Sequence, residues 1–224
     1  MHQKYLDKID RDIAAKHLSK HPFYLAWTRG ELSREALADY AQQYYHHVAA
    51  FPTYLSAVHA KCDDQTTRKT LLNNLIDEEA GSPNHPDLWL KFAEGLGVSG
   101  FEARKPEKWP ETKNLIDTFR SVCRDGSTVE GLAALYAYES QIPSICESKI
   151  DGLKKHYGFA DPKHYEYFSV HLEADREHSA VEREMLSRYI DKQNFKSVKA
   201  SVNRVLDALW DKLSGVCRLH AIAC

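Results

Sequence analysis

Apolar residues recur at helical spacing along almost the whole chain, and no stretch alternates apolar and polar residues as a half-buried β-strand would. Glycine and proline, which interrupt helices, number only 10 and 8 among 224 residues and fall mostly between the periodic stretches. The longest of these stretches cover residues 33–62, 127–157, 161–189 and 195–214. We therefore predict an all-α fold, a bundle of seven to eight helices.

Local signals place several helix ends. Ser127 and Glu130 have the spacing of a capping box, in which each residue bonds the backbone N–H of the other. Asp161 followed by Pro162 is typical of a helix N-terminus. The helix that begins after Ser127 includes Pro143, which predicts a bend at that point.

The composition fits one folded domain and excludes several classes of function. The length predicts a single domain over residues 1–224, with the stretch from about residue 195 packed as a last helix. Thirty Lys and Arg against 32 Asp and Glu give a net charge of -2, which argues against binding nucleic acid or a membrane surface. No apolar run approaches the ~20 residues of a membrane span. Five widely spaced cysteines without a CxxC pair predict a reducing, cytoplasmic location.

The stretch HLEADREH carries the clearest chemical signal. His171, Asp175 and His178 are spaced i, i+4, i+7, so they project from one face of a helix within a sector of ~60°. Two imidazoles and a carboxylate on one stripe suit a first-row transition metal. A solvated polar stripe is the competing interpretation, because the neighbouring residues are also charged. Those neighbours are Glu173, Arg176, Glu177 and Glu182.

Two further stretches offer carboxylates and a histidine. Glu139 shares the apolar face of its helix with Leu135 and Ile142, and a buried carboxylate needs a metal, an arginine or a proton as partner. In DEEAGSPNHPDLW, a helix ends and a proline-stiffened turn follows, which can fold a histidine back toward the last turn. That histidine is His85. Periodicity does not separate Glu78 from Glu79 as the carboxylate that it meets.

The combined set of three carboxylates and three imidazoles fits two divalent ions. The ligands carry a charge of about -3 against about +4 for the ions, which leaves room for a bridging anion and open positions for oxygen chemistry. Dinuclear carboxylate sites occur in helical bundles. The ferritin-like version requires two Glu-x-x-His motifs, and the sequence contains none. A different helical scaffold is indicated.

Six separated stretches together resemble a known family. They are HPFYLAW, RGEL, AFPTYLSAVHAKCDD, DEEAGSPNHPDLW, AALYAYESQIP and HLEADREH, and they extend over nearly all of the chain to about residue 190. The chain resembles the family of the Chlamydia protein associating with death domains. That family shares a heme-oxygenase-like fold with pyrroloquinoline quinone synthesis protein C and the TenA group.

This resemblance implies a heme-oxygenase-like bundle without heme that carries a dinuclear centre, Fe/Fe or Fe/Mn. It implies dioxygen and an external reductant as co-substrates, and it favours Glu78 over Glu79. The implied ligands are Glu78, His85, Glu139, His171, Asp175 and His178. By analogy with the fold, we also expect a homodimer.

The family makes para-aminobenzoate for folate biosynthesis by oxidative excision and amination of its own tyrosine, in a single turnover. The resemblance places the consumed residue at Tyr24 and the amine donor at Lys149. On a straight helix Lys149 would lie ~15 Å from Glu139, which weakens its assignment. Tyr138 and Tyr167 are candidates for relaying an oxidising equivalent, or for being the target.

Other functions remain open from the sequence. The same centre could oxidise a diffusible substrate such as an amino acid or a fatty acid, or the chain could be a helical interaction protein without activity. Heme ligation by His17 or His21 has less support, because a dinuclear site would occupy the space of the heme. A thiaminase-like nucleophile at Cys123 or Cys146 also has less support, because buried structural thiols are commoner than reactive ones.

Overall fold

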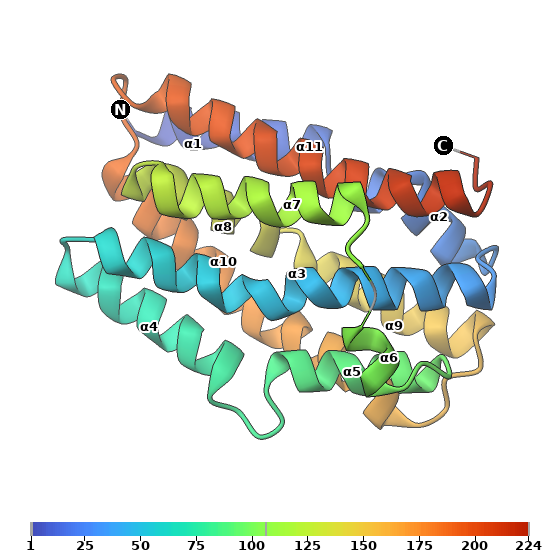
Figure 1. Ribbon diagram of the computed structural model, residues 1–224. Coiled ribbons are helices and arrows are strands. Elements are labelled where there is room, and N and C mark those ends of the chain that lie inside the picture. Colours follow the sequence, from blue (N-terminus) through green and yellow to red (C-terminus); the bar gives the residue numbers. More distant parts are fainter. Residues whose placement is uncertain (1, 106, 224) are drawn as a thin grey trace.

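The computed structural model describes residues 2–105 and 107–223, and in these residues it contains helices and no strands, which confirms the all-α class (Figure 1). The first helices are α1 (Gln3–Ala15), α2 (Pro22–Arg29), α3 (Arg34–Lys61), α4 (Gln65–Glu79), α5 (His85–Gly95) and α6 (Gly100–Arg104). The others are α7 (Pro110–Arg120), α8 (Thr128–Glu139), α9 (Ile142–His156), α10 (Glu166–Tyr189) and α11 (Phe195–Leu219). None of the described helices combines the length and apolar character that crossing a membrane requires.

The described part of the chain has eleven α-helices rather than the seven to eight expected, and two of the additional helices have a local cause. The helix predicted over residues 127–157 is divided into α8 and α9, because the backbone turns at Ser140 and Gln141. Pro143 lies in the first turn of α9, where its missing N–H leaves no helical hydrogen bond unmade. The stretch between α5 and α7 also contains the short helix α6.

The predicted helix starts are only partly correct. The capping box is present, since the backbone N–H of Ser127 donates to the Glu130 carboxylate at 2.7 Å and the Ser127 hydroxyl accepts from the Glu130 N–H. Asp161 also caps a helical turn, but this is the short 3₁₀ turn Pro162–His164. Helix α10 begins only at Glu166, so the prediction of one helix from Asp161 is wrong.

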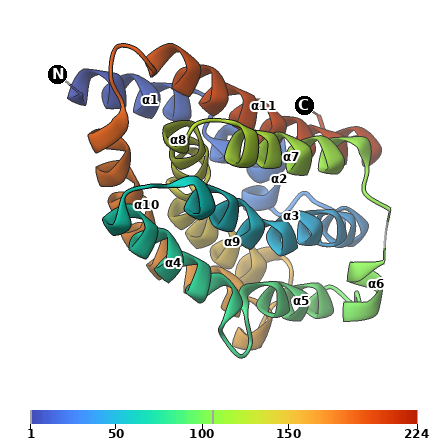
Figure 2. The same ribbon diagram turned by 60° about the vertical axis from the view of Figure 1, so that its left-hand side comes forward.

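Helix α3 runs through the middle of the molecule and packs against α4, α5, α7 and α8 (Figure 1). Helix α11 lies along one side of the bundle and packs against α1, α7 and α8. Helix α10 packs against α4, α5, α8 and α9 (Figure 2). The ends of α4 and α8, the start of α5 and the middle of α10 therefore come together inside the bundle.

A close contact between α2 and α9 fixes another part of the interior. A Cβ atom on Gly152 would lie 2.7 Å from Cδ1 of Trp27, so only glycine lets the indole ring approach α9 this closely. The Trp27 indole N–H donates to the carbonyl of Lys149 at 3.3 Å. This contact holds α2, which carries Tyr24, against the helix that carries Lys149.

Candidate metal centre

Four helices bring the six predicted metal-ligating side chains together in two groups of three. The first ligand group is Glu78, His85 and His171, and the second ligand group is Glu139, Asp175 and His178. Within each group, one nitrogen or carboxylate oxygen from each residue lies within 4.8 Å of the others. Each group mixes imidazole and carboxylate, a donor set that iron and manganese accept.

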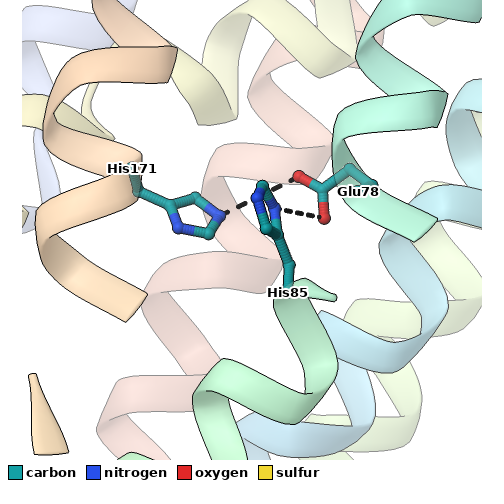
Figure 3. Close-up of side chains that lie close together, drawn as sticks. All are labelled: Glu78, His85 and His171. Carbon is teal, nitrogen blue, oxygen red and sulfur yellow. Dashed lines mark ion pairs between the residues drawn. The ribbon is translucent and has the colours of Figure 1, made fainter. Parts of the chain in front are cut away.

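The first ligand group joins the end of α4 to the start of α5 and to α10 (Figure 3). The Nδ1 atom of His85 lies 3.0 Å from Oε2 of Glu78, and Nε2 of His171 lies 3.9 Å from Oε1 of Glu78. The side chain of Asn84 caps α5, so the first residue of that helix, His85, faces the last turn of α4. Glu79, the alternative carboxylate, is exposed.

The second ligand group joins the last residue of α8 to two adjacent turns of α10. Glu139 and Asp175 are buried, and His178 is half-buried with its Nδ1 3.6 Å from Oδ1 of Asp175. The amide of Asn74 donates to both carboxylate oxygens of Glu139, at 3.1 and 3.3 Å. One amide does not balance a buried carboxylate charge, so this group is suited to a cation.

Neighbouring groups orient two of the imidazoles in a way that suits metal ligation. The Nδ1 atom of His171 lies 2.8 Å from the carbonyl of Tyr167, to which it donates, so the lone pair of Nε2 points toward Glu78. The Nε2 atom of His178 lies 3.2 Å from the Asp77 carboxylate, which leaves Nδ1 directed toward Asp175. Such outer partners fix the tautomer of a ligating histidine and raise its basicity.

The electrostatics of the two groups also fit a pair of cations. Burial raises the pKa of Asp175 to about 7 and raises the pKa of Glu139 as well. Burial alone would lower the pKa of His178, but its hydrogen bond to Asp175 and the charge of Glu139 raise it to about 9. Burial, followed by the charge of His85, lowers the pKa of His171. Protons thus take the places that divalent ions would occupy, and metal binding would release them.

A cavity of about 10 Å³ lies between the two ligand groups. Its walls are members of both groups together with Val48, Phe51, Tyr138 and Tyr167. This is room for about one water-sized molecule. Dioxygen is of similar size, whereas an amino acid or a fatty acid would need the walls to move.

A row of tyrosines leads away from this cavity. The hydroxyl groups of Tyr138 and Tyr44 lie 2.8 Å apart, and the rings of Tyr44 and Tyr40 stack with their centroids 5.3 Å apart. The hydroxyl groups of Tyr40 and Tyr24 lie 3.1 Å apart. Burial raises the pKa of all four phenols, so they are neutral at pH 7. The second predicted relay residue, Tyr167, stacks on the ring of His171 at 4.0 Å.

Lys149 lies at the far end of this row. Its side chain is buried, its amine donates to the Tyr40 hydroxyl at 2.7 Å, and Nζ lies 5.1 Å from the centroid of the Tyr24 ring. Burial lowers the pKa of Lys149 to about 7. The chain turns at Ser140 and Gln141, close to the bend predicted at Pro143, so the ~15 Å separation along one straight helix does not apply.

Sequence reasoning missed Glu182, which it counted among the charged neighbours of the stripe. Glu182 is 2% exposed, and both of its carboxylate oxygens are buried without a hydrogen-bond donor among the described residues. A signal was available, because Glu182 follows His178 by four residues and so continues the His171, Asp175 and His178 face of α10.

Sequence reasoning also missed Lys212 on α11. Its side chain is 2% exposed, Nζ has no hydrogen-bond partner in the described structure, and Nζ lies 4.0 Å from the centroid of the Tyr40 ring. Burial, followed by the charge of Lys149, lowers its pKa. Its place on one helix face with Leu209, Leu213 and Val216 was the signal that indicated burial.

Replacing Lys212 by methionine is expected to raise the free energy of unfolding by about 1–2 kcal/mol at pH 7. Burial lowers the pKa of Lys212 well below that of the unfolded chain, so the unfolded state binds more protons and the wild-type protein gains stability as pH rises toward ~10.4. The advantage of Lys212→Met should therefore shrink between pH 7 and pH 10. Urea unfolding at both pH values measures this, with Lys196→Met on the exposed side of α11 as the control. Equal stability of the two variants at pH 7 would contradict it.

The candidate heme ligand His21 and the candidate nucleophiles Cys123 and Cys146 lie in surroundings that suit structural roles. His21 accepts a hydrogen bond from the Phe23 N–H at 3.0 Å and so caps α2, and its other nitrogen lies 3.0 Å from the Ser214 hydroxyl. Burial raises the pKa of Cys123 and Cys146 to about 12, which keeps both thiols protonated and unreactive at pH 7.

The fold defines the class of heme-oxygenase-like helical proteins. The structure superposes with a TM-score of 0.82 on a TenA homolog from Pseudomonas syringae pv. tomato, over 97% of this chain and 93% of that chain at 17% identity. It superposes with a TM-score of 0.81 on a domain with a heme oxygenase-like fold from Shewanella denitrificans, over 98% and 93% of the two chains at 19% identity. At these identities the likeness concerns the fold.

Sequence comparison identifies the family. Residues 38–210 match the family of iron-containing redox enzymes, and the chain belongs to it. The chain is 45% identical to the 4-aminobenzoate synthase of Chlamydia pneumoniae, over 94% of this chain and 93% of that protein. It is also 45% identical to the 4-aminobenzoate synthase of Nitrosomonas europaea, over 95% and 90% of the two chains.

Proposed function

We propose that this chain is an oxygen-dependent dimetal enzyme that makes 4-aminobenzoate for folate biosynthesis from its own Tyr24, with Lys149 as the nitrogen source. The product is suggested by the relatives at 45% identity, which are named 4-aminobenzoate synthase. Two bound ions, Fe/Fe or Fe/Mn, would supply the oxidising chemistry, with dioxygen as oxidant and an external reductant as electron source. Each chain would act once, because the reaction consumes one of its side chains.

The chemistry of tyrosine suits this product. The tyrosine ring and its Cβ carbon have the skeleton of 4-aminobenzoate, with the phenol oxygen para to Cβ. Formation of the product would break the Cα–Cβ bond, leave a glycine at position 24 and oxidise Cβ from a methylene to a carboxylate. Cleavage of the Cε–Nζ bond of Lys149 would release the nitrogen that replaces the phenol oxygen, leaving an aldehyde at Cε, and the phenol oxygen would leave as water. Dioxygen would accept the electrons removed from Cβ and Cε, and the external reductant would supply those still needed to reduce it to water.

The observation that carries the proposal is the row of tyrosines between the cavity and the Lys149 amine. Tyr138 lines the cavity, and hydrogen bonds or ring stacking join it through Tyr44 and Tyr40 to Tyr24. Neighbouring phenols in contact can pass an oxidising equivalent while a bonded hydroxyl accepts the proton. The row would let Tyr24 be oxidised although it does not line the cavity between the ligand groups.

The position of Lys149 beside Tyr24 supports the proposed amination. The amine of Lys149 lies 5.1 Å from the Tyr24 ring centroid, and the rigid helices α2 and α9 hold the two side chains in place. A neutral amine is nucleophilic, whereas an ammonium group is not. The lowered pKa of Lys149, about 7, keeps a large fraction of this amine unprotonated at neutral pH.

Product formation in a single turnover is therefore expected to rise with pH through about pH 7, as Lys149 loses its proton. A tenfold loss is expected for each pH unit well below that value. Quenched-flow measurement of 4-aminobenzoate from metal-loaded protein gives the profile, with bound metal assayed at each pH. Lys149→Met should remove the product at every pH and keep the metal, whereas Lys154→Met, at an exposed site on α9, should match wild type. A flat profile between pH 5.5 and 8.5 would contradict the role of Lys149.

Intact-mass analysis tests the proposed function as a whole. Protein reconstituted anaerobically should hold about two metal ions per chain. After dioxygen and a reductant are added, we expect 4-aminobenzoate in solution and a mass loss that peptide mapping places at Tyr24. An unchanged Tyr24 with repeated turnover of an added amino acid or fatty acid would favour the diffusible-substrate enzyme, and absence of metal binding would favour an interaction protein.

A further inference from the structure

Glu182 is the one buried carboxylate of α10 that the six-ligand centre does not use. It occupies the i+11 position of the face that carries His171, Asp175 and His178, so it points into the same interior. Its side chain is 2% exposed, and neither carboxylate oxygen accepts a hydrogen bond from any described donor. A buried carboxyl group without a donor costs several kcal/mol unless a cation or a proton balances it.

Glu182 interacts with another buried carboxyl group. Glu139 and Glu182 lie within hydrogen-bonding reach of one another, and the amide of Asn74 donates only to Glu139. Two carboxylate groups repel unless something positive lies between them. Because Glu139 belongs to the second ligand group, a metal ion bound there would lie beside Glu182.

We propose that Glu182 is a seventh protein ligand, which binds the ion held by Glu139, Asp175 and His178. The inference rests on the metal pair of the proposed function and extends it to a residue outside the six-ligand set. With Glu182 ionised, four carboxylates carry about -4 and balance the charge of two divalent ions, so the buried centre is neutral.

A cavity on the surface side gives the ion a path to Glu182. This cavity has a volume of about 340 Å³ and is lined by Asp77, Glu177, His178 and Glu182, among others. Its acidic walls attract cations, and Glu182 is a lining residue whose side chain is buried. An ion entering by this route would meet Glu182 and His178 before the rest of the second ligand group.

The competing explanation is a proton shared between Glu139 and Glu182, since burial and the mutual charge raise the pKa of both groups. Glu182→Gln separates the two explanations, because glutamine keeps the shape and can donate to Glu139 but is a poor ligand. With a shared proton, Glu182→Gln would leave Mn²⁺ affinity at the wild-type value. With a seventh ligand, it should weaken one of two Mn²⁺ sites by about 10–100-fold and leave the other unchanged.

Electron paramagnetic resonance of free Mn²⁺ measures the affinities of the two Mn²⁺ sites in wild type, in Glu182→Gln and in the matched control Glu173→Gln. Glu173 is exposed on α10. A crystal structure of the Mn²⁺-loaded wild-type chain adds a readout that folding defects do not affect. A Glu182 oxygen about 2.0–2.2 Å from the anomalous peak supports ligation. Two bound ions with both Glu182 oxygens more than 3 Å from the nearer ion would contradict the assignment of Glu182 as a seventh ligand. Equal Mn²⁺ affinities of the two variants would contradict it as well. Either result would leave the proposed function intact. Absence of Mn²⁺ binding to wild type would overturn both.

Discussion

Replacing Tyr24 by phenylalanine is expected to abolish 4-aminobenzoate formation, by about 100-fold or more, and to leave metal binding unchanged. Phenylalanine keeps the ring but has no oxygen to lose to an amine, and it breaks the hydroxyl contact with Tyr40. The protein should remain folded, because the ring packs against Phe23 and Trp27 in both forms. The measurement is product per chain after a single exposure to dioxygen and reductant, with bound metal assayed in parallel.

Tyr54→Phe is the matched control for this substitution. Tyr54 is fully buried in the same bundle, and its hydroxyl has no hydrogen-bond partner among the described residues. Its loss should not change the yield. Wild-type yield from the Tyr24→Phe protein would contradict the assignment and move the target to Tyr138 or Tyr167, or would show that the carbon comes from another molecule.

Replacing Glu139 by glutamine is expected to lower the affinity of the second ligand group for its ion by more than about 100-fold. Loss of even an outer partner of a metal ligand lowers metal affinity by about 10–100-fold. Product should fall below detection, because one ion alone does not form the dinuclear centre. The metal-free protein should be at least as stable as metal-free wild type, since glutamine removes a buried carboxyl group and can donate to Glu182. Metal titration and thermal unfolding of the metal-free protein measure both effects.

Glu173→Gln makes the same chemical change on the exposed side of α10 and should bind two ions and form product like wild type. If Glu139→Gln kept both ions and full product, the second ligand group would not be a metal site. If the variant instead lost stability without metal, Glu139 would be a structural residue whose contacts with Asn74 hold α8 against α4.

The sequence pattern predicted the helical class and the convergence of His85, Glu139, His171, Asp175 and His178, and the family resemblance selected Glu78 over Glu79. Residues on one helix, such as His171 and Asp175, are placed by the helical repeat alone. His85 could be predicted because a capped helix start follows the end of α4 after a short turn. In each case the local chain geometry determines the position of the side chain.

What the sequence did not predict depends on contacts between distant segments. The turn at Ser140 and Gln141, which separates α8 from α9, is followed by a proline that is equally compatible with a bent helix. The burial of Glu182 requires Glu139 to approach from α8, and that of Lys212 requires α11 to cover Tyr40. A charged residue on a helix is usually exposed, and this expectation outweighed the helix face that each of the two residues shares with buried neighbours.

The most direct test of a self-consuming reaction is to follow the carbon atoms of tyrosine. The protein is produced with ring-¹³C-labelled tyrosine, purified, loaded with metal and exposed to dioxygen and a reductant in unlabelled buffer. We predict that the released 4-aminobenzoate carries the fully labelled ring, with at most one molecule per chain. Unlabelled 4-aminobenzoate, or several labelled or unlabelled molecules per chain, would contradict the use of the protein's own tyrosine.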